Sequence, residues 1–138
     1  MIYHHLYLLY LYYFNIKRDY YECHDVLEEL WLEEGCYSFY QGLIQVAVGL
    51  YHFRWNNIEG AKLLFEGGLK KLEAYPDHHY GINVQKLRHD VKHYLYKLNH
   101  IEEDPFEFYD LTIEIVDEDL QEMVEGIARE MEQEQNSP

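Results

Sequence analysis

The sequence is poor in residues that cross-link or interrupt a chain, with two cysteines and three prolines among 138 residues. Cys23 falls within a helical pattern and Cys36 in a short connection, and neither belongs to a zinc or redox motif. So few thiols exclude a disulfide framework and are typical of a reduced, cytoplasmic protein. A single domain of this length buries roughly two thirds of its unfolded surface, which is enough for a core without cross-links.

The sequence also lacks an apolar run that could cross a membrane. Its most apolar stretch, MIYHHLYLLYLYYFN at the N-terminus, is too short to span a bilayer. The stretch has no basic region before it and no small-residue cleavage site, so it does not resemble a signal peptide. We therefore expect a core helix here, in a soluble protein with no membrane partner.

Basic residues are nearly absent from the last part of the chain. Residues 1–101 carry 12 acidic and 10 basic side chains, whereas 102–138 carry 14 acidic side chains and only Arg129, for a net charge of −15. A nucleic-acid-binding protein needs a basic surface to replace condensed counterions, and no stretch supplies one. We predict a helical core domain at 1–101 and an acidic C-terminal extension at 102–138, with an extended segment and one amphipathic helix.

Apolar residues at helical spacing predict helices over 19–34 and 38–55, a third that starts at Ile58, and a fourth that Asn83 caps. Residues 38–55 are apolar around most of the helix circumference, which is typical of a helix packed on several sides. The expected fold is all-α: a compact multihelical bundle of stacked helical hairpins around a buried central helix at about 40–55. No β-sheet is expected beyond a short extended piece near 111–115.

The helical pattern repeats. A shift of 38 residues places DYYECHDVLEELW on NIEGAKLLFEGGL, with Tyr20 on Ile58 and Cys23 on Ala61. Each helix hairpin of such a repeat is too small to bury its apolar stripe alone, so the two hairpins are expected to stack.

Three stretches carry a resemblance to a known family: YYECHDVLEELW, FYQGLIQVAVGLYHF and the N-x-x-GA-x-x-L pattern that follows. Over residues 14–98 the sequence resembles the bacterial and archaeal proteins of domain of unknown function 309, most specifically in H-x-x-x-E-x-x-W and GLIQ. The resemblance implies a compact multihelical domain with a buried central helix, and it implies no activity.

One candidate polar cluster stands out from this apolar pattern. His24 and Glu28 lie one turn apart at the rim of the apolar face of 19–34, and the central helix carries a narrow polar stripe of Gln41, Gln45 and His52. Packing of the hairpin would bring the stripe against that rim. The cluster is either a hydrogen-bonded network that fixes helix register or a functional site.

As a site, the cluster would offer His24, Glu28 and His52 as three ligands for a divalent metal such as zinc, or as an acid/base set for a small substrate. The pattern lacks the second helical histidine of H-E-x-x-H, and no P-loop, G-x-S-x-G or G-x-G-x-x-G motif occurs. Whether the protein is an enzyme therefore stays open.

The favoured function is a non-enzymatic protein–protein interaction or structural module, with a protein partner or a homo-oligomer. The apolar stripe of 120–131 can fold back on the domain or dock on a partner. Trp31 is expected to anchor the core, Tyr40 is expected to fill the core or an interface, and QEQNSP at the C-terminus is expected to be disordered. The alternative is a metal-dependent or acid/base enzyme built on His24, Glu28 and His52.

Overall fold

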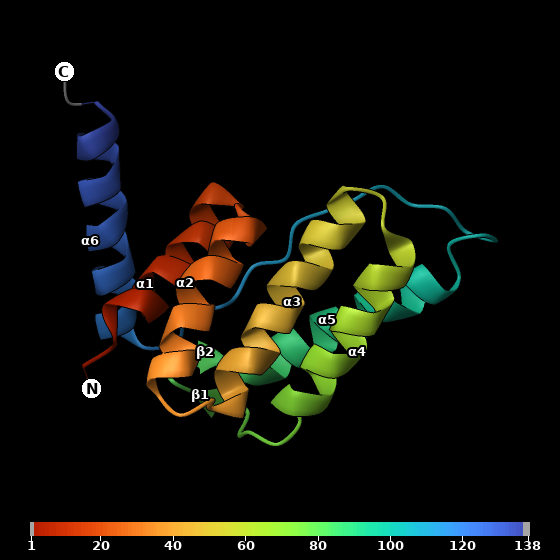
Figure 1. Ribbon diagram of the computed structural model, residues 1–138, viewed down its shortest axis with the longest axis horizontal. Coiled ribbons are helices and arrows are strands. Elements are labelled where there is room, and N and C mark those ends of the chain that lie inside the picture. The colour runs from red at the N-terminus through yellow and green to blue at the C-terminus, as the bar shows by residue number, and fades with distance from the viewer. Residues whose placement is uncertain (1, 137–138) are drawn as a thin grey trace.

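The computed structural model describes residues 2–136 and has the all-α fold that the sequence predicted (Figure 1). The α-helices are α1 (His5–Tyr12), α2 (Tyr20–Glu33), α3 (Ser38–Arg54), α4 (Ile58–Leu72), α5 (Val84–Asn99) and α6 (Glu118–Gln135). A π-helical turn, Tyr13–Lys17, continues α1. No helix between residues 2 and 136 combines the length and the apolarity needed to cross a membrane.

Helix α3 is the centre of the fold, as predicted for about 40–55. Ten of its residues are buried, and it packs between α2 and α4, which lie on either side of it in Figure 1. Gly49 allows α3 and α4 to approach closely, because a Cβ atom there would lie 2.7 Å from the Phe65 ring. The all-round apolarity of this helix thus reflects packing against several neighbours.

The helices begin where side-chain caps predict. The Asp19 carboxylate accepts a hydrogen bond from the Glu22 amide at 3.1 Å, and the Asn83 side chain accepts one from the Lys86 amide at 2.9 Å. Helices α2 and α4 begin at Tyr20 and Ile58, the two residues that the 38-residue shift aligns.

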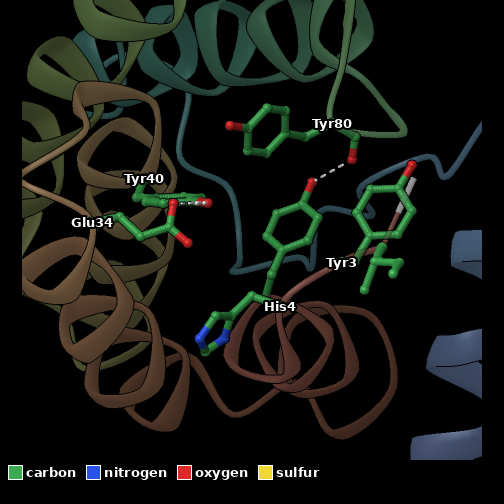
Figure 2. Close-up of a pocket in the computed structure, with 7 residues that line it drawn as sticks. Tyr3, His4, Glu34, Tyr40 and Tyr80 are labelled. Atoms are coloured by element: carbon green, nitrogen blue, oxygen red, sulfur yellow. Dashed lines mark hydrogen bonds between the residues drawn. The ribbon is translucent and has the colours of Figure 1, made fainter.

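A small β-hairpin between α4 and α5 corrects the expectation that no β-sheet occurs beyond a short extended piece near 111–115. Strands β1 (His78–His79) and β2 (Ile82–Asn83) pair antiparallel, and β2 also bridges to Ile115. Tyr80 and Gly81 have φ angles of 49° and 78°, as a two-residue hairpin turn requires. The Tyr7 hydroxyl donates to the Tyr80 carbonyl at 2.8 Å and so ties this turn to α1 (Figure 2).

The chain after α5 returns across the domain, and α6 packs against α1 (Figure 1). Asn15 holds this returning segment by two hydrogen bonds to the backbone of Ile113, both 2.8 Å. The apolar side of α6 is buried, so the stripe of 120–131 folds back on the domain. Helix α6 extends to Gln135, further than predicted; Ser137 and Pro138 lie outside the described residues.

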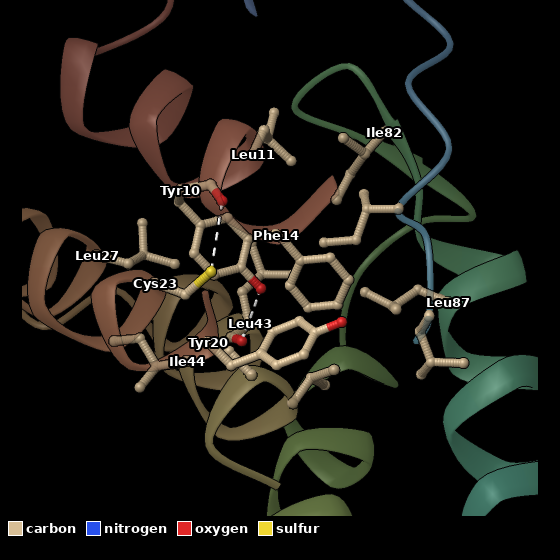
Figure 3. Packing of buried hydrophobic residues seen from close by; sticks show 14 of the residues in the cluster. Tyr10, Leu11, Phe14, Tyr20, Cys23, Leu27, Leu43, Ile44, Ile82 and Leu87 are labelled. Carbon is tan, nitrogen blue, oxygen red and sulfur yellow. Dashed lines mark hydrogen bonds between the residues drawn. The ribbon is translucent and has the colours of Figure 1, made fainter. Parts of the chain in front are cut away.

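Tyrosines contribute much of the core, and several of their hydroxyls are hydrogen-bonded. Tyr10 is fully buried, and its hydroxyl donates to the Leu43 carbonyl at 2.8 Å (Figure 3). The thiol of Cys23 lies 3.6 Å from the Tyr10 carbonyl, and both cysteines are free. The single cluster of buried apolar residues includes Leu111 and Val124, so the C-terminal segment belongs to the same core.

Candidate functional site

The five residues of the predicted polar cluster lie along a groove over α3. A hollow of about 310 Å³ adjoins a smaller one of about 140 Å³, and the two share His24 and Val48. We call them together the α3 groove. Its larger part is lined by His24, Glu28, Trp31, Gln41, Ile44, Gln45, Val48 and Leu64, and its smaller part by Tyr20, Tyr21, His24, Val48, Tyr51 and His52.

His24 and Glu28 form a close pair on the α2 side of the groove. The His24 Nε2 atom lies 2.6 Å from Glu28 Oε2, and its Nδ1 atom lies 3.3 Å from Asp25 Oδ1. The spacing of one helical turn places His24 above Glu28 on the same face. Both ring nitrogens of His24 therefore face carboxylate oxygens of its own helix.

The polar side chains of α3 have partners outside the predicted cluster. The Gln45 side-chain oxygen accepts a hydrogen bond from Lys71 Nζ of α4 at 3.0 Å. His52 Nδ1 lies 3.4 Å from the Asn57 amide nitrogen, at the α3–α4 connection. Gln41 lines the larger hollow, whereas His52 lines only the smaller one. The cluster is therefore spread along the groove instead of converging on one point.

The cluster is not a buried network. Relative exposures are 37% for the His24 side chain and 44% for that of Glu28, and no polar or charged residue in the described chain is classed as buried. The burial that the core-network interpretation predicts is therefore not found at His24 and Glu28. These side chains form the wall and floor of an open groove, where water can satisfy them.

The predicted zinc ligands are not assembled either. Between residues 2 and 136, no three His, Cys, Asp or Glu side chains are grouped closely enough to hold a metal ion. His24 pairs with Glu28 as predicted, but His52 lies against Asn57 and does not complete a ligand set. The geometry gives no support to a metal bound by His24, Glu28 and His52.

The sequence did not reveal the position of Trp31 in the groove, and this residue was predicted to anchor the core. Trp31 lines the larger hollow, and its indole Nε1 is a buried nitrogen with no hydrogen-bond partner among the described atoms. Buried N–H groups nearly always have a hydrogen-bond acceptor, so the lack of one at Trp31 Nε1 is unusual. The signal was its position three residues after Glu28, which places both on one face of α2.

The comparisons with known proteins concern the same part of the chain. The model of a domain of unknown function (DUF309) matches residues 7–64. The uncharacterized protein YpuF of Bacillus subtilis (strain 168) is 44% identical over 71 residues, which are 49% of this chain and 41% of YpuF. An uncharacterized protein of Aquifex aeolicus (strain VF5) is 32% identical over 73 residues, 51% of this chain and 22% of that protein.

The chain spans less than half the length of these two curated relatives. No solved structure matches it significantly. The family match begins earlier and ends sooner than the predicted range of 14–98, and it includes every residue that lines the α3 groove. Residues 7–64 thus match the DUF309 model, a resemblance that the motifs in α2 and α3 predicted, and the α3 groove is built within this segment.

Proposed function

We propose that the protein is a non-enzymatic interaction module whose α3 groove binds an amphipathic, basic helix of a partner protein. The observation that carries this proposal is the continuity of the groove, whose two hollows run along one face of α3. The two unpaired cysteines fit a cytoplasmic setting for this interaction.

The floor of the groove has the periodicity of a helix-binding surface. Gln41, Gln45, Val48 and His52 recur every three or four residues along α3, and Ile44 adds apolar surface beside them. A partner helix that lies along α3 would present its own apolar residues at matching intervals, as in other helix-in-groove complexes.

The charge of α2 favours a basic partner. Helix α2 carries acidic residues throughout and has no lysine or arginine, and its Glu28 carboxylate lines the groove. A lysine or arginine on the partner would pair with this wall, and complementary charge would speed association and fix the direction of docking.

Aromatic side chains at the groove supply contact area. Tyr21 lines the smaller hollow with a relative exposure of 53%. Trp55, exposed at 70%, contacts the Tyr51 ring, which lines the same hollow. Tyrosine and tryptophan are enriched at protein interfaces because they combine a large apolar body with a polar group.

Tryptophan fluorescence provides the test, because the protein's two tryptophans are Trp31 in the groove and Trp55 beside it. The probes are an amphipathic leucine–lysine helical peptide and a peptide of the same composition whose leucines are spread around the helix. We expect saturable binding of the first peptide, with a blue shift of the emission. Equal binding of the two peptides would contradict a helix-shaped site.

Two variants locate the binding surface. Val48→Glu adds a carboxylate to the groove floor, whereas Tyr96→Glu adds one at an exposed position of α5 outside the groove. Only Val48→Glu is expected to weaken peptide binding, by about tenfold or more, because it places a charge in the apolar contact. If a second copy of the chain is the true occupant, sedimentation will show a dimer that Val48→Glu dissociates, and the proposed partner is then wrong.

A further inference from the structure

Helix α5 carries a pair of histidines on its outer side. His89 and His93 are both exposed and lie one helical turn apart, on the same face of the helix. Neither residue lines the α3 groove. The opposite side of α5 is fixed in the core by the buried residues Val84, Leu87, Val91, Tyr94 and Leu98. The core thus holds the helix in place while the two imidazoles face solvent.

The two imidazole rings have no partners. Between residues 2 and 136, neither ring makes a hydrogen bond, an ion pair or a ring contact with another residue. Five other histidines differ, because a ring nitrogen of each lies against another polar group; they are His4, His24, His52, His79 and His100. His5 and His78 have no second histidine one helical turn away. Among the described residues, only His89 and His93 thus combine free ring nitrogens with helical-pair spacing.

Two imidazoles at this spacing can hold one metal ion. The Cβ atoms of residues four apart on a helix are about 5–6 Å apart, and the two histidines of the H-E-x-x-H zinc motif use the same spacing. Neutral imidazole is a good ligand for Cu²⁺, Ni²⁺ and Zn²⁺. Water can complete the coordination, because both rings are exposed and His89 borders a hollow of about 290 Å³.

The basic side chains near the pair are compatible with a bound cation. Lys86 is paired with Asp90 at 2.8 Å, and Lys97 Nζ lies 4.3 Å from the centre of the Phe106 ring. Lys92 has no acidic partner among the described residues, but it is exposed. Like charges on the exposed face of a helix repel one another only weakly. Coordinate bonds from two imidazoles are therefore expected to outweigh the repulsion from Lys92.

We propose that His89 and His93 bind a divalent transition-metal ion of the copper, nickel and zinc class as a two-histidine chelate. The ion forms a coordinate bond with one nitrogen of each ring, and α5 sets the spacing of the two rings. The site has two protein ligands and is separate from the three-ligand site that the sequence predicted at His24, Glu28 and His52. Because the chelate spans one turn of α5, it forms only where that turn is helical, and metal binding stabilises the folded chain.

Calorimetry with Ni²⁺ and the full chain without a histidine tag tests the proposal. Ni²⁺ suits imidazole ligands and, unlike Cu²⁺, does not oxidise the two free thiols. We expect saturable binding of one ion. His93→Gln should weaken this binding by about tenfold or more, because the second imidazole then no longer acts at high effective concentration. Equal affinity in the parent and in His93→Gln, or no binding by the parent, would overturn the proposal.

The matched control is His78→Gln, which removes an exposed histidine that has no neighbour at helical-pair spacing. This variant should keep the affinity of the parent. A loss as large as that in His93→Gln would place the ion at another histidine and contradict the assignment.

A double variant tests the spacing itself. His93→Gln combined with Gln85→His moves the pair one turn toward the start of α5, because position 85 is exposed and lies four residues before His89. This variant should recover the binding that His93→Gln loses, and failure to recover it would contradict a chelate across one turn. In thermal unfolding, Ni²⁺ should raise the midpoint of the parent and of the double variant, but not that of His93→Gln. An equal rise in all three would place the metal elsewhere.

Discussion

The environment of His24 in the structure is more open to solvent than its sequence position suggested. It lies at the rim of the apolar face of α2, as the helical pattern predicts, but its ring is turned toward Asp25 and Glu28 at the edge of an open groove. Which residues share a helix face can be predicted from spacing alone. The exposure of that face depends on how closely the neighbouring helices approach, and this is set by packing elsewhere in the fold.

This position of His24 makes its removal nearly harmless to folding. His24→Ala should change the free energy of unfolding by less than about 1 kcal/mol, because the contact with Glu28 that it breaks is exposed and the carboxylates beside it stay hydrated. Urea unfolding followed by circular dichroism measures the change. The matched control is Leu27→Ala on the same helix, which removes a fully buried side chain and should cost about 2–5 kcal/mol. A comparable loss in both variants would restore the core-network interpretation.

Among the elements, the contact between α3 and α4 depends on the absence of a side chain at Gly49. A Cβ atom there would lie 2.7 Å from the Phe65 ring, so Gly49→Ala should destabilise the protein by about 1–3 kcal/mol. Gly126 of α6 is the control, because the nearest side-chain atom to its added Cβ is Arg129 Nη2 at 3.8 Å. Gly126→Ala should stabilise by roughly 0.5–1 kcal/mol, the usual gain from alanine in an open helix. Thermal unfolding of both variants would show shifts of opposite sign.

The sequence could predict the helices, because capping residues and helical periodicity are local signals. The Asp19 and Asn83 caps are examples, and both form as expected. The β-hairpin could not be predicted in this way. Its turn uses Tyr80 at a positive φ angle where asparagine or glycine is usual, and β2 is supported by Ile115 from far along the chain. The sequence predicted that the polar stripe of α3 faces the rim of α2, but it predicted neither the open groove between them nor the Trp31 wall.

In the whole molecule, most of the excess negative charge lies in the C-terminal segment, yet this segment shares one hydrophobic core with the rest of the chain. The acidic residues after position 101 lie on a segment whose apolar side chains are buried with those of α1 to α5. The Tyr3 hydroxyl donates to Asp117, and this bond joins the start of the described chain to the beginning of α6. We therefore expect the acidic segment and the helical core to unfold together.

Val124 provides the test of this coupling. It lies on the buried side of α6 with a relative exposure of 2%, and Val124→Asp would bury an unpaired carboxylate at a cost of about 3 kcal/mol or more. The loss should appear equally in circular dichroism and in the fluorescence of Trp31 and Trp55, which are remote from α6 in sequence. Glu122→Asp, at an exposed position of α6, is the control and should leave both transitions in place. If α6 melts while the fluorescence transition stays unchanged, the two parts are independent.

The packing of α6 on α1 also has a consequence for biosynthesis. Helix α1 leaves the ribosome before α6, the helix that covers one of its sides and that is made more than 100 residues later. At translation rates of about 5–20 residues per second, α1 lacks its contact with α6 for several seconds or more. During that interval α1, which is rich in leucine and tyrosine, can form non-native contacts with other chains. The nascent chain is therefore expected to be most vulnerable to aggregation, and most dependent on chaperones, just before α6 emerges.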